Sequence, residues 1–596
     1  MAYRAPVSEI QFALMQEAGF QRLIDSGQYE DLSDDLLTAI LDEAAKLAND
    51  YVAPANWDGD QTGAHLTEDG VKVPESFKTA YAKYIEGGWP TLAAPNEYGG
   101  QGLPLALSNA VTEMMNSNIG FQLCPMLSNG GIEAMAAHAT EEQKEKYLRR
   151  VISGEWSATM NLTEPHAGSD VGNIRSKAIP QDDGSYKITG TKIYITYGDH
   201  DMTDNIIHLV LARTPGAPEG TKGISLFVVP KFMVDDDGAL GAANDVKCIG
   251  LEEKLGIHAS PTCVMAFGEN VDETGGATGW LVGPEHGGMA CMFTMMNNAR
   301  LHVGLQGVGV AEAATQHALA YAQERKQGRK PGAAKDDNDA VAIINHPDVR
   351  RMLLTMRAMT DAARAICYEN GVMADLADAT GDAEAKAAAK AKNDLLTPIS
   401  KAFSTDIANE VASIGVQIHG GMGFVEETGA AQYLRDARIL PIYEGTNGIQ
   451  AMDLVGRKLG NGDTIKAYMA EISDTAETCR QSNNPVLVDV AERLGHALDT
   501  LADTTDWLVA QRGSLNVLAG ATPYLRLFGL VAGCHYLARG AHAVTQNSVE
   551  PNFDQRKLAS AQFYAHNLLS AVGGLSDAVK AGNDMLDDIG ESALAS

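Results

Sequence analysis

The feature that most constrains the fold is a β-rich block that interrupts an otherwise helical chain. Near Trp156 the helical pattern gives way to runs such as SYKITGTKIYIT, NIIHLVLARTP and GISLFVVPKF, which are bounded by Gly and Pro. Before it, TEEQKEKYLRRV opens with a capping box, Thr140 with Gln143. Helical periodicity returns after residue 280 with GMACMFTMMNNARLHVGLQGVG. We therefore expect an α+β multidomain protein in which a β module separates helical domains.

The chain is too long for a single hydrophobic core, since it has 596 residues. We place an N-terminal arm at 1–40, a helical domain at 41–155 and a β domain at 156–280. A helical bundle follows at 281–462, and an appended helical domain, rich in Ala and Leu, occupies 463–596. The expected order is α, β, α and a further α domain.

Charge and residue usage exclude several classes of function. The formal net charge is −31, which disfavours binding to nucleic acid or to an anionic membrane, because both need a basic surface. No signal-peptide layout and no apolar run of spanning length is evident. The seven cysteines form no CxxC pair, so we expect reduced thiols and a cytoplasmic location. The histidines form no HExxH pattern, so no protein-bound metal is expected.

The segment LPIYEGTNGIQ, residues 440–450, places a carboxylate in unusual surroundings. Glu444 lies between Tyr443 and a Gly-Thr-Asn-Gly turn, and the segment contains no basic residue. One interpretation is a turn residue with a solvated side chain. The other is a base directed into a pocket, since an apolar setting raises the pKa of a carboxyl group. The segment by itself leaves both open.

Four further motifs have both an ordinary and a functional interpretation. The loop NLTEPHAGSDVGN (161–173) can be a plain Gly/Ser loop or can face a phosphate or a flat polar ring. Tyr194 and Thr196 share one face of a strand, where they form an ordinary aromatic face or a flavin contact. ERKQGR (324–329) is a solvated helix end or a pyrophosphate contact. Gln417, before a Gly-Gly pair, marks a helix cap or a close approach to a ligand.

Taken together and in this order, these motifs resemble the acyl-CoA dehydrogenase family over roughly residues 40–460. The matching stretches are LTEPHAGSDV, KIYIT, ARLHVGLQGVG, ERKQGR, QIHGGMGF and RDARILPIYEGTNGIQ. The resemblance implies a helical N-terminal domain, a middle β domain and a C-terminal four-helix bundle. It also implies bound FAD and assembly as a homodimer or homotetramer.

The resemblance assigns roles to particular residues. Glu444 takes the position of the catalytic base, which removes the α-proton of an acyl thioester while FAD accepts the β-hydride. Ser169 and Arg300 would contact the substrate, and Arg325 and residues 417–421 would reach the FAD of a neighbouring subunit. The implied FAD contacts are Leu162, Thr163, Ser169, Tyr194, Thr196, Arg325, Gln417, Gly420, Gly421, Thr446 and Asn447. A few subfamilies place the base at the position of Ala299, which here has no proton acceptor.

The arm and the appended domain narrow the expected substrate. Both are similar to the bacterial subfamily that oxidises 3-methylmercaptopropionyl-CoA to 3-methylthioacryloyl-CoA during dimethylsulfoniopropionate breakdown. Electron-transferring flavoprotein is then the expected electron acceptor. Rival functions are a dehydrogenase of straight short- or medium-chain acyl-CoA and an acyl-CoA oxidase. A DNA-associated relative would need a basic C-terminal domain, which 465–596 lacks, and an inactive homologue does not fit an intact Glu444.

Overall fold

The computed structural model describes residues 3–29, 32–235, 238–332, 339–460 and 462–595. It divides into two compact units, which are described separately. The β unit comprises 46–104 and 115–299, and the helical unit comprises 1–45, 105–114 and 300–596. The domain limits expected from the sequence stay predictions, whereas the α+β class with a helical N-terminal region, a β module and helical C-terminal regions is confirmed.

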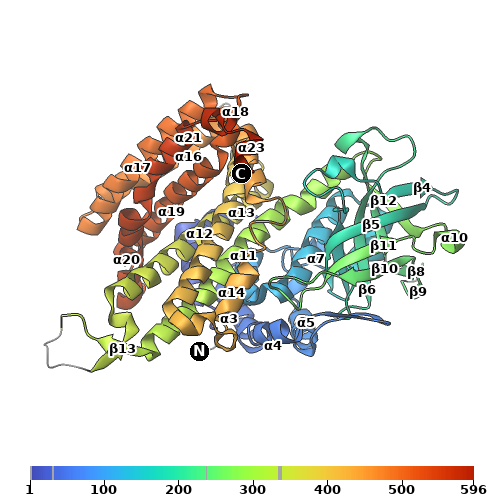
Figure 1. Ribbon diagram of the computed structural model, residues 1–596, viewed down its shortest axis with the longest axis horizontal. Coiled ribbons are helices and arrows are strands. Elements are labelled where there is room, and N and C mark those ends of the chain that lie inside the picture. Colours follow the sequence, from blue (N-terminus) through green and yellow to red (C-terminus); the bar gives the residue numbers. More distant parts are fainter. Residues whose placement is uncertain (1–2, 30–31, 236–237, 333–338, 461, 596) are drawn as a thin grey trace. The chain divides into compact units, whose positions relative to one another are not determined.

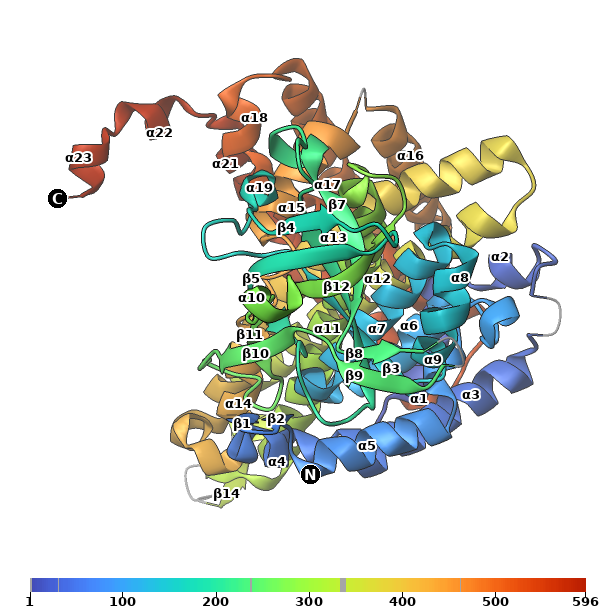
Figure 2. The same cartoon turned by 90° about the vertical axis from the view of Figure 1, so that its right-hand side faces the viewer.

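The β unit is built on an eight-stranded sheet with the order β10-β11-β5-β12-β7-β6-β3, and β4 pairs with β5 (Figure 2). Among the described residues, β3 and β6 form the only parallel pair of strands in this sheet. SYKITGTKIYIT contains the whole of one long strand, β5, which runs through Gly190 without a break. The strands are β3 (Trp156–Asn161), β4 (Lys177–Pro180), β5 (Tyr186–Thr196), β6 (Asn205–Ala212), β7 (Ser225–Pro230), β10 (Val246–Leu251), β11 (Thr262–Phe267) and β12 (Ala277–Val282).

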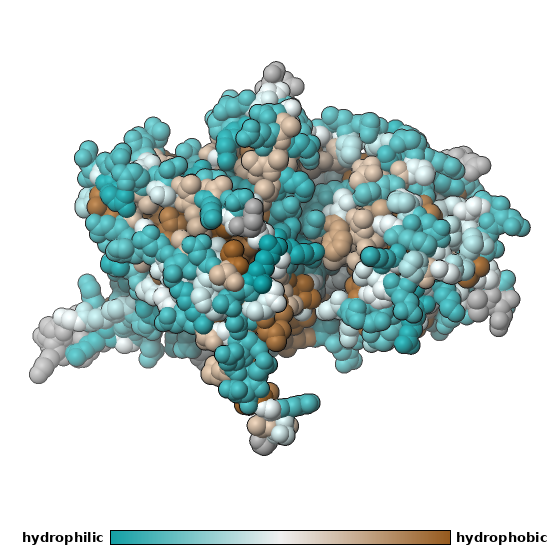
Figure 3. Space-filling model, turned by 90° about the horizontal axis from the view of Figure 1, so that it is seen from above, coloured by the Kyte–Doolittle hydropathy of each residue, from teal (hydrophilic) through white to brown (hydrophobic). Residues whose placement is uncertain are grey.

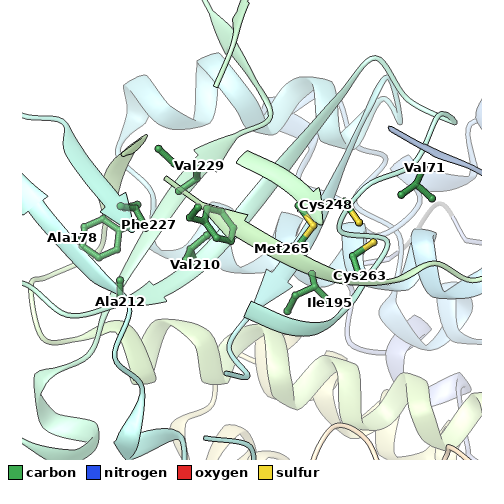
Figure 4. Packing of buried hydrophobic residues seen from close by; sticks show 13 residues of the cluster. Val71, Ala178, Ile195, Val210, Ala212, Phe227, Val229, Cys248, Cys263 and Met265 are labelled. Atoms are coloured by element: carbon green, nitrogen blue, oxygen red, sulfur yellow. The ribbon is translucent and has the colours of Figure 1, made fainter. Parts of the chain in front are cut away.

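Apolar side chains from several strands form the core of the β unit (Figure 4). Ile195, Val210, Phe227 and Met265 belong to this cluster and are almost inaccessible to solvent. Strands β6 and β7 are buried along their whole length, which explains why their sequences read as continuous apolar runs rather than as alternating ones. The unit also contains helices, among them α4 (Pro54–Thr62), α5 (Glu75–Glu86) and α7 (Ile119–His138).

Three long helices form the centre of the helical unit (Figure 1). They are α11 (Gly288–Glu324), which belongs to this unit from Arg300, α12 (Pro347–Ala379) and α13 (Ala383–His419). Gly304 and Gly307 let α11 approach α13 closely, because a Cβ atom there would lie 2.5 Å from the carbonyl oxygen of Ser400 and 2.6 Å from that of Ser404. Shorter helices α14 (Ala430–Ala437) and α15 (Asn447–Asp453) flank the segment that contains Glu444.

The arm and the appended segment pack against each other in the helical unit. The arm forms α1 (Val7–Phe12) and α2 (Gln21–Ile24), and Lys557 binds Glu9 and Glu17 at 3.0 Å each. The Phe12 and Phe553 rings meet edge to face at 5.0 Å. The helices of the appended segment are α16 (Asp463–Arg480), α17 (Pro485–Ala510), α18 (Leu515–Ala519), α19 (Ala521–Gln546), α20 (Pro551–Asn567), α21 (Val572–Lys580), α22 (Asp584–Asp588) and α23 (Glu591–Leu594).

Hydrophilic residues predominate on the face drawn in Figure 3, in keeping with the net charge of −31. Within the described ranges, no helix has the length and apolar character that crossing a bilayer requires.

Candidate active site

Glu444 has a backbone conformation that few residues with a side chain adopt. It lies in the loop between α14 and α15 with φ of 58°, and Gly445 follows with φ of 82°. Left-handed backbone costs energy for a residue with a Cβ atom, and such strain concentrates at functional sites. Tyr194, another predicted site residue, has φ of 59°. Both positions are therefore held by their surroundings and not by local preference.

Burial changes the protonation of Glu444. It raises the pKa of the Glu444 carboxyl to about 7, although the cations Arg300 and Lys401 oppose the rise. A solvated turn residue would keep an ordinary pKa, so this property favours the interpretation as a base. At neutral pH the carboxyl group exchanges its proton readily, as a general base requires.

Arg300 is a buried neighbour of Glu444. Its Nη1 atom lies 3.5 Å from Oδ2 of Asp453, and Asp453 also binds Nε of Arg457 at 2.5 Å. Desolvation lowers the pKa of the Arg300 guanidinium, while Asp453 and Glu444 oppose that shift. The side chain of Arg300 is thus part of the electrostatic environment of the carboxyl group.

The side-chain amide of Asn447 links the loop that contains Glu444 to α13 through hydrogen bonds. Its Nδ2 donates to the carbonyl of Ala402 at 3.1 Å, to Oγ1 of Thr405 at 3.0 Å and to Oδ1 of Asp406 at 2.7 Å. Its Oδ1 accepts from Nζ of Lys401 at 2.9 Å. The predicted contact of Asn447 with FAD stays a prediction, and these bonds give the residue a structural role as well.

Sequence reasoning missed Lys401 and Asp406. The available signal was weak: SKAFSTD places a lysine in an apolar helical run, with a hydroxyl group and a carboxylate one turn later.

Thr446, a predicted FAD contact, caps α15, because its Oγ1 accepts from the backbone N–H of Ile449 at 3.2 Å. The hydroxyl group of Tyr443 donates to Oε1 of Gln306.

The β unit brings a second group of predicted residues together. The N–H of Ile193 donates to the carbonyl of Thr163 at 2.9 Å, and Nζ of Lys192 donates to the carbonyl of Leu162 at 3.0 Å. The loop that begins at Leu162 is therefore fixed to β5, next to Tyr194. Within β5, Tyr194 is 60% exposed and Thr196 is half-buried, so both face outward from the sheet's core.

A buried ion pair supports this loop. Lys192 is inaccessible to solvent and binds Oε1 of Glu164 at 2.9 Å, while Glu164 also accepts from the N–H groups of Arg175 at 2.7 Å and Ser176 at 3.0 Å. Burial lowers the pKa of Lys192 to about 8, and Glu164 opposes the shift. Neither residue was singled out in the sequence. Ser169, which was, lies exposed farther along the same loop.

The remaining predicted residues lie elsewhere in the helical unit. Arg325 follows the last residue of α11 and is exposed, as are Gln417, Gly420 and Gly421 at the end of α13. A Cβ atom on either glycine would meet nothing within 4 Å. Gln417 is about 24 Å along α13 from Lys401, because a helix rises 1.5 Å per residue. The structure therefore does not bring these residues together with Glu444.

The residues of the β unit fit a flavin. An exposed aromatic ring, a hydroxyl group and a firmly anchored Gly/Ser loop lie on and beside β5, and the side chain of Tyr194 is 60% exposed. A flat ring system with polar edges matches such a surface. No cluster of three or more His, Cys, Asp or Glu side chains suited to a metal ion occurs in the described parts of the chain.

Comparison with known proteins places the chain in a family. Residues 35–155, 159–270 and 286–459 match the N-terminal, middle and C-terminal domains of acyl-CoA dehydrogenase. Residues 468–589 match the family described as acetyl-CoA dehydrogenase C-terminal like. The chain belongs to the acyl-CoA dehydrogenase family. The resemblance inferred from the sequence motifs is confirmed, and the protein is an oxidoreductase of this family.

Three relatives illustrate the range of the family. The chain is 46% identical to 3-methylmercaptopropionyl-CoA dehydrogenase of Ruegeria pomeroyi over 96% of both chains. It is 35% identical to butyryl-CoA dehydrogenase of Syntrophomonas wolfei over 99% of both. The solved structure of acyl-CoA dehydrogenase from Bacillus anthracis, complexed with FAD, is 22% identical with a TM-score of 0.74, covering 94% of this chain and 91% of that one.

Proposed function

We propose that this protein is an FAD-dependent dehydrogenase that converts 3-methylmercaptopropionyl-CoA to 3-methylthioacryloyl-CoA, with Glu444 as the catalytic base. The observation that carries the proposal is the Glu444 carboxyl group, which has a left-handed backbone and a pKa raised to about 7 by burial. A base near neutral pKa suits proton removal next to a thioester carbonyl.

The reaction breaks one C–H bond at the α-carbon and one at the β-carbon and forms a double bond between them. Glu444 takes the α-proton, and its backbone N–H donates to the thioester carbonyl, where negative charge develops. FAD, when bound, supplies the acceptor for the hydride from the β-carbon. Leu162, Thr163, Ser169, Tyr194 and Thr196 would hold the cofactor, and Ser169 and Arg300 would contact the substrate. Thr446 and Asn447 would also contact FAD.

The identity of the acyl group rests on the relative from Ruegeria pomeroyi, which shares 46% of its residues over nearly the whole chain. The similarity includes the arm and the appended segment, which pack on each other here through Lys557 and Phe553. The reaction then belongs to the breakdown of dimethylsulfoniopropionate. A straight short-chain acyl-CoA is the second candidate, because butyryl-CoA dehydrogenase of Syntrophomonas wolfei also aligns over 99% of its length.

An anaerobic titration of the FAD-loaded protein separates these substrates. We expect 3-methylmercaptopropionyl-CoA to bleach the flavin most strongly and at lower concentration than butyryl- or octanoyl-CoA. An equal or better response to a straight chain would assign the second candidate. Absence of bleaching with every thioester would overturn the proposal. Reoxidation of the reduced flavin by air at the rate of turnover would indicate an oxidase instead.

Replacement of the base tests its role directly. We expect Glu444→Gln to retain the yellow flavin and thioester binding but to lose turnover by a factor on the order of 10³ or more, because no other group takes the α-proton. The measurement is the rate of anaerobic flavin reduction in stopped flow. A variant that reduces its flavin at the wild-type rate would show that another residue is the base.

The proposal extends to partners and location. The enzyme works in the cytoplasm, passes electrons to electron-transferring flavoprotein and assembles as a homodimer or homotetramer. Assembly is supported by the exposure of Arg325, Gln417, Gly420 and Gly421, and by Phe424, which is 88% exposed. Sedimentation of the wild type and of Phe424→Ser tests the assembly, and a monomeric wild type would overturn it.

A further inference from the structure

Lys401 is a buried cation that the reaction does not use directly. It lies on α13 with no accessible surface, and its Nζ atom donates to the carbonyl of Leu440 at 2.8 Å and to Oδ1 of Asn447 at 2.9 Å. Burying an ammonium group is costly unless its donors are satisfied. The two hydrogen bonds of Lys401 offset this cost and hold its ammonium group in a defined place.

The two acceptors of Lys401 bracket the catalytic segment. Leu440 precedes Glu444 by four residues and Asn447 follows it by three, so one ammonium group ties both ends of the loop to a single point of α13. Asn447 adds three bonds to the next turn of the same helix, to Ala402, Thr405 and Asp406. Glu444, with its strained left-handed backbone, lies between the two residues that these hydrogen bonds hold.

We propose that Lys401 is the positioning residue of the base: its ammonium group holds residues 440 and 447 together and thereby keeps Glu444 in its left-handed conformation. The inference rests on the proposed function, because it takes Glu444 to be the base. Lys401 itself contacts neither substrate nor cofactor.

The charge of Lys401 has a second effect on Glu444. The charged groups that influence Glu444 are Arg300 on α11 and Lys401 on α13, and both lower its pKa. Asp406 acts on Lys401, and Asp453 and Arg457 act on Arg300. Burial lowers the pKa of Lys401 to about 7, close to that of Glu444, so the two groups titrate as an interacting pair. Without Lys401, the Glu444 carboxylate forms only at higher pH.

The test compares Lys401→Met, Lys401→Gln and Lys401→Arg with the wild type. We expect the Met and Gln variants to lose about tenfold or more in kcat, with a smaller change in KM. The acid limb of the pH profile of kcat/KM moves upward by about one pH unit, because a cation near a carboxylate shifts its pKa by that order. Lys401→Arg retains the positive charge and can still donate hydrogen bonds. We therefore expect its acid limb of kcat/KM to lie close to that of the wild type.

A readout that does not depend on activity follows Glu444 directly. The infrared band of its protonated carboxyl group, assigned by its loss in Glu444→Gln, is titrated in the FAD-loaded wild type and in the Lys401 variants. We expect the same upward shift of the midpoint in Lys401→Met and Lys401→Gln. If that shift occurs but no thioester reduces the flavin in the wild type, the proposed function fails while the positioning role stands.

Lys557→Met is the matched control. Lys557 is also buried and paired in the helical unit, with Glu9 and Glu17, but it belongs to the contact between arm and appended segment. It is expected to lower stability without moving the Glu444 midpoint. An unchanged midpoint in Lys401→Met and Lys401→Gln would overturn the proposal, as would an equal shift in the Lys557 control. Should Lys401→Met not fold, Lys401→Gln, which keeps a donor, decides the result.

Discussion

At the scale of single residues, Glu444 shows how backbone and environment act together. Its backbone is left-handed, and burial raises the pKa of its carboxyl group to about 7. Gly445, with φ of 82°, continues the same unusual path. The properties that suit Glu444 to the proposed role of base thus come from its place in the loop and not from its residue type alone.

The pH dependence of catalysis follows from this pKa. A base must be ionised, so a raised pKa moves the loss of activity to higher pH. We expect kcat/KM to rise with pH along a limb whose apparent pKa is about 7, and to fall tenfold per unit below it. Steady-state rates between about pH 5 and pH 9 provide the measurement. A limb at the ordinary glutamate pKa would contradict the burial of the carboxyl group.

Gly445 tests whether the loop conformation itself matters. A Cβ atom there would lie 2.9 Å from Nε2 of Gln450 and would also strain a backbone with φ of 82°. We expect Gly445→Ala to reduce kcat by about tenfold or more, since it displaces the neighbouring carboxyl group. Gly513→Ala is the control, because Gly513 has φ of 86° but no atom within 4 Å of an added Cβ. It is expected to lower the thermal midpoint and leave kcat unchanged; equal kcat in the two variants would refute the prediction.

At the scale of elements, α13 organises the helical unit. One part of it touches α11 at Gly304 and Gly307, and the turns at 401–406 hold the catalytic loop. Its last residues, near Gln417, are exposed. One helix therefore supports both the packing of the bundle and the position of Glu444, the proposed base.

A buried network of charges joins α6 (Leu105–Met115), α11 and α12. Arg364 lies 2.7 Å from Glu113, 2.9 Å from Glu312 and 3.0 Å from Asp361, and all four side chains are almost inaccessible. Arg357 also binds Glu312 at 2.6 Å. These cations hold the pKa of Glu312 well below its ordinary value despite burial.

Removal of Arg364 should destabilise the helical unit strongly. We expect Arg364→Met to cost about 3–5 kcal/mol at neutral pH, because it leaves buried carboxylates without their cation. Since a lowered carboxyl pKa stabilises the fold only above that pKa, the difference from the wild type should shrink as pH falls. Denaturant unfolding at several pH values measures both effects. Arg351→Ala, which breaks an exposed pair with Asp348, should cost less than about 1 kcal/mol; an equal loss in both would disprove the burial argument.

At the scale of the whole molecule, the arm and the appended segment are bound to each other although they lie at opposite ends of the sequence. Lys557 of α20 binds Glu9 and Glu17, and its ammonium group lies 4.8 Å from the centre of the Phe12 ring. Arg22 of the arm binds Glu369 of α12 at 2.8 Å. The two additions outside residues 40–460 are therefore one structural feature.

This contact predicts coupled stability. We expect Lys557→Met to release the arm, so that limited proteolysis cleaves the first 24 residues about tenfold faster or more, because Glu17 is left buried without a cation. Mass spectrometry of the fragments gives the rates. Lys580→Met, which breaks an exposed pair with Asp503 in the same segment, should leave the rate unchanged. Cleavage of Lys557→Met at the slow rate of the wild type would mean that the apolar contacts alone hold the arm.

The sequence by itself determined the order of helical and β regions and the capping box at Thr140, and it singled out Glu444 as the proposed base. These features are local: a capping box spans four residues, and a catalytic segment carries its glycines and its carboxylate together. Strand β5 runs through Gly190 without a break, because pairing with the neighbouring strands β11 and β4 keeps it continuous.

Only the tertiary structure decided the pairings that make those local features work. Lys401 lies 39 residues from Leu440 and 46 from Asn447, Arg364 lies 251 residues from Glu113, and Lys557 lies 540 residues from Glu17. No spacing in the sequence marks such partners, because each is chosen by which helices pack together. The physical reason is that a buried charge is tolerated only where a partner meets it, and the fold alone brings that partner within reach.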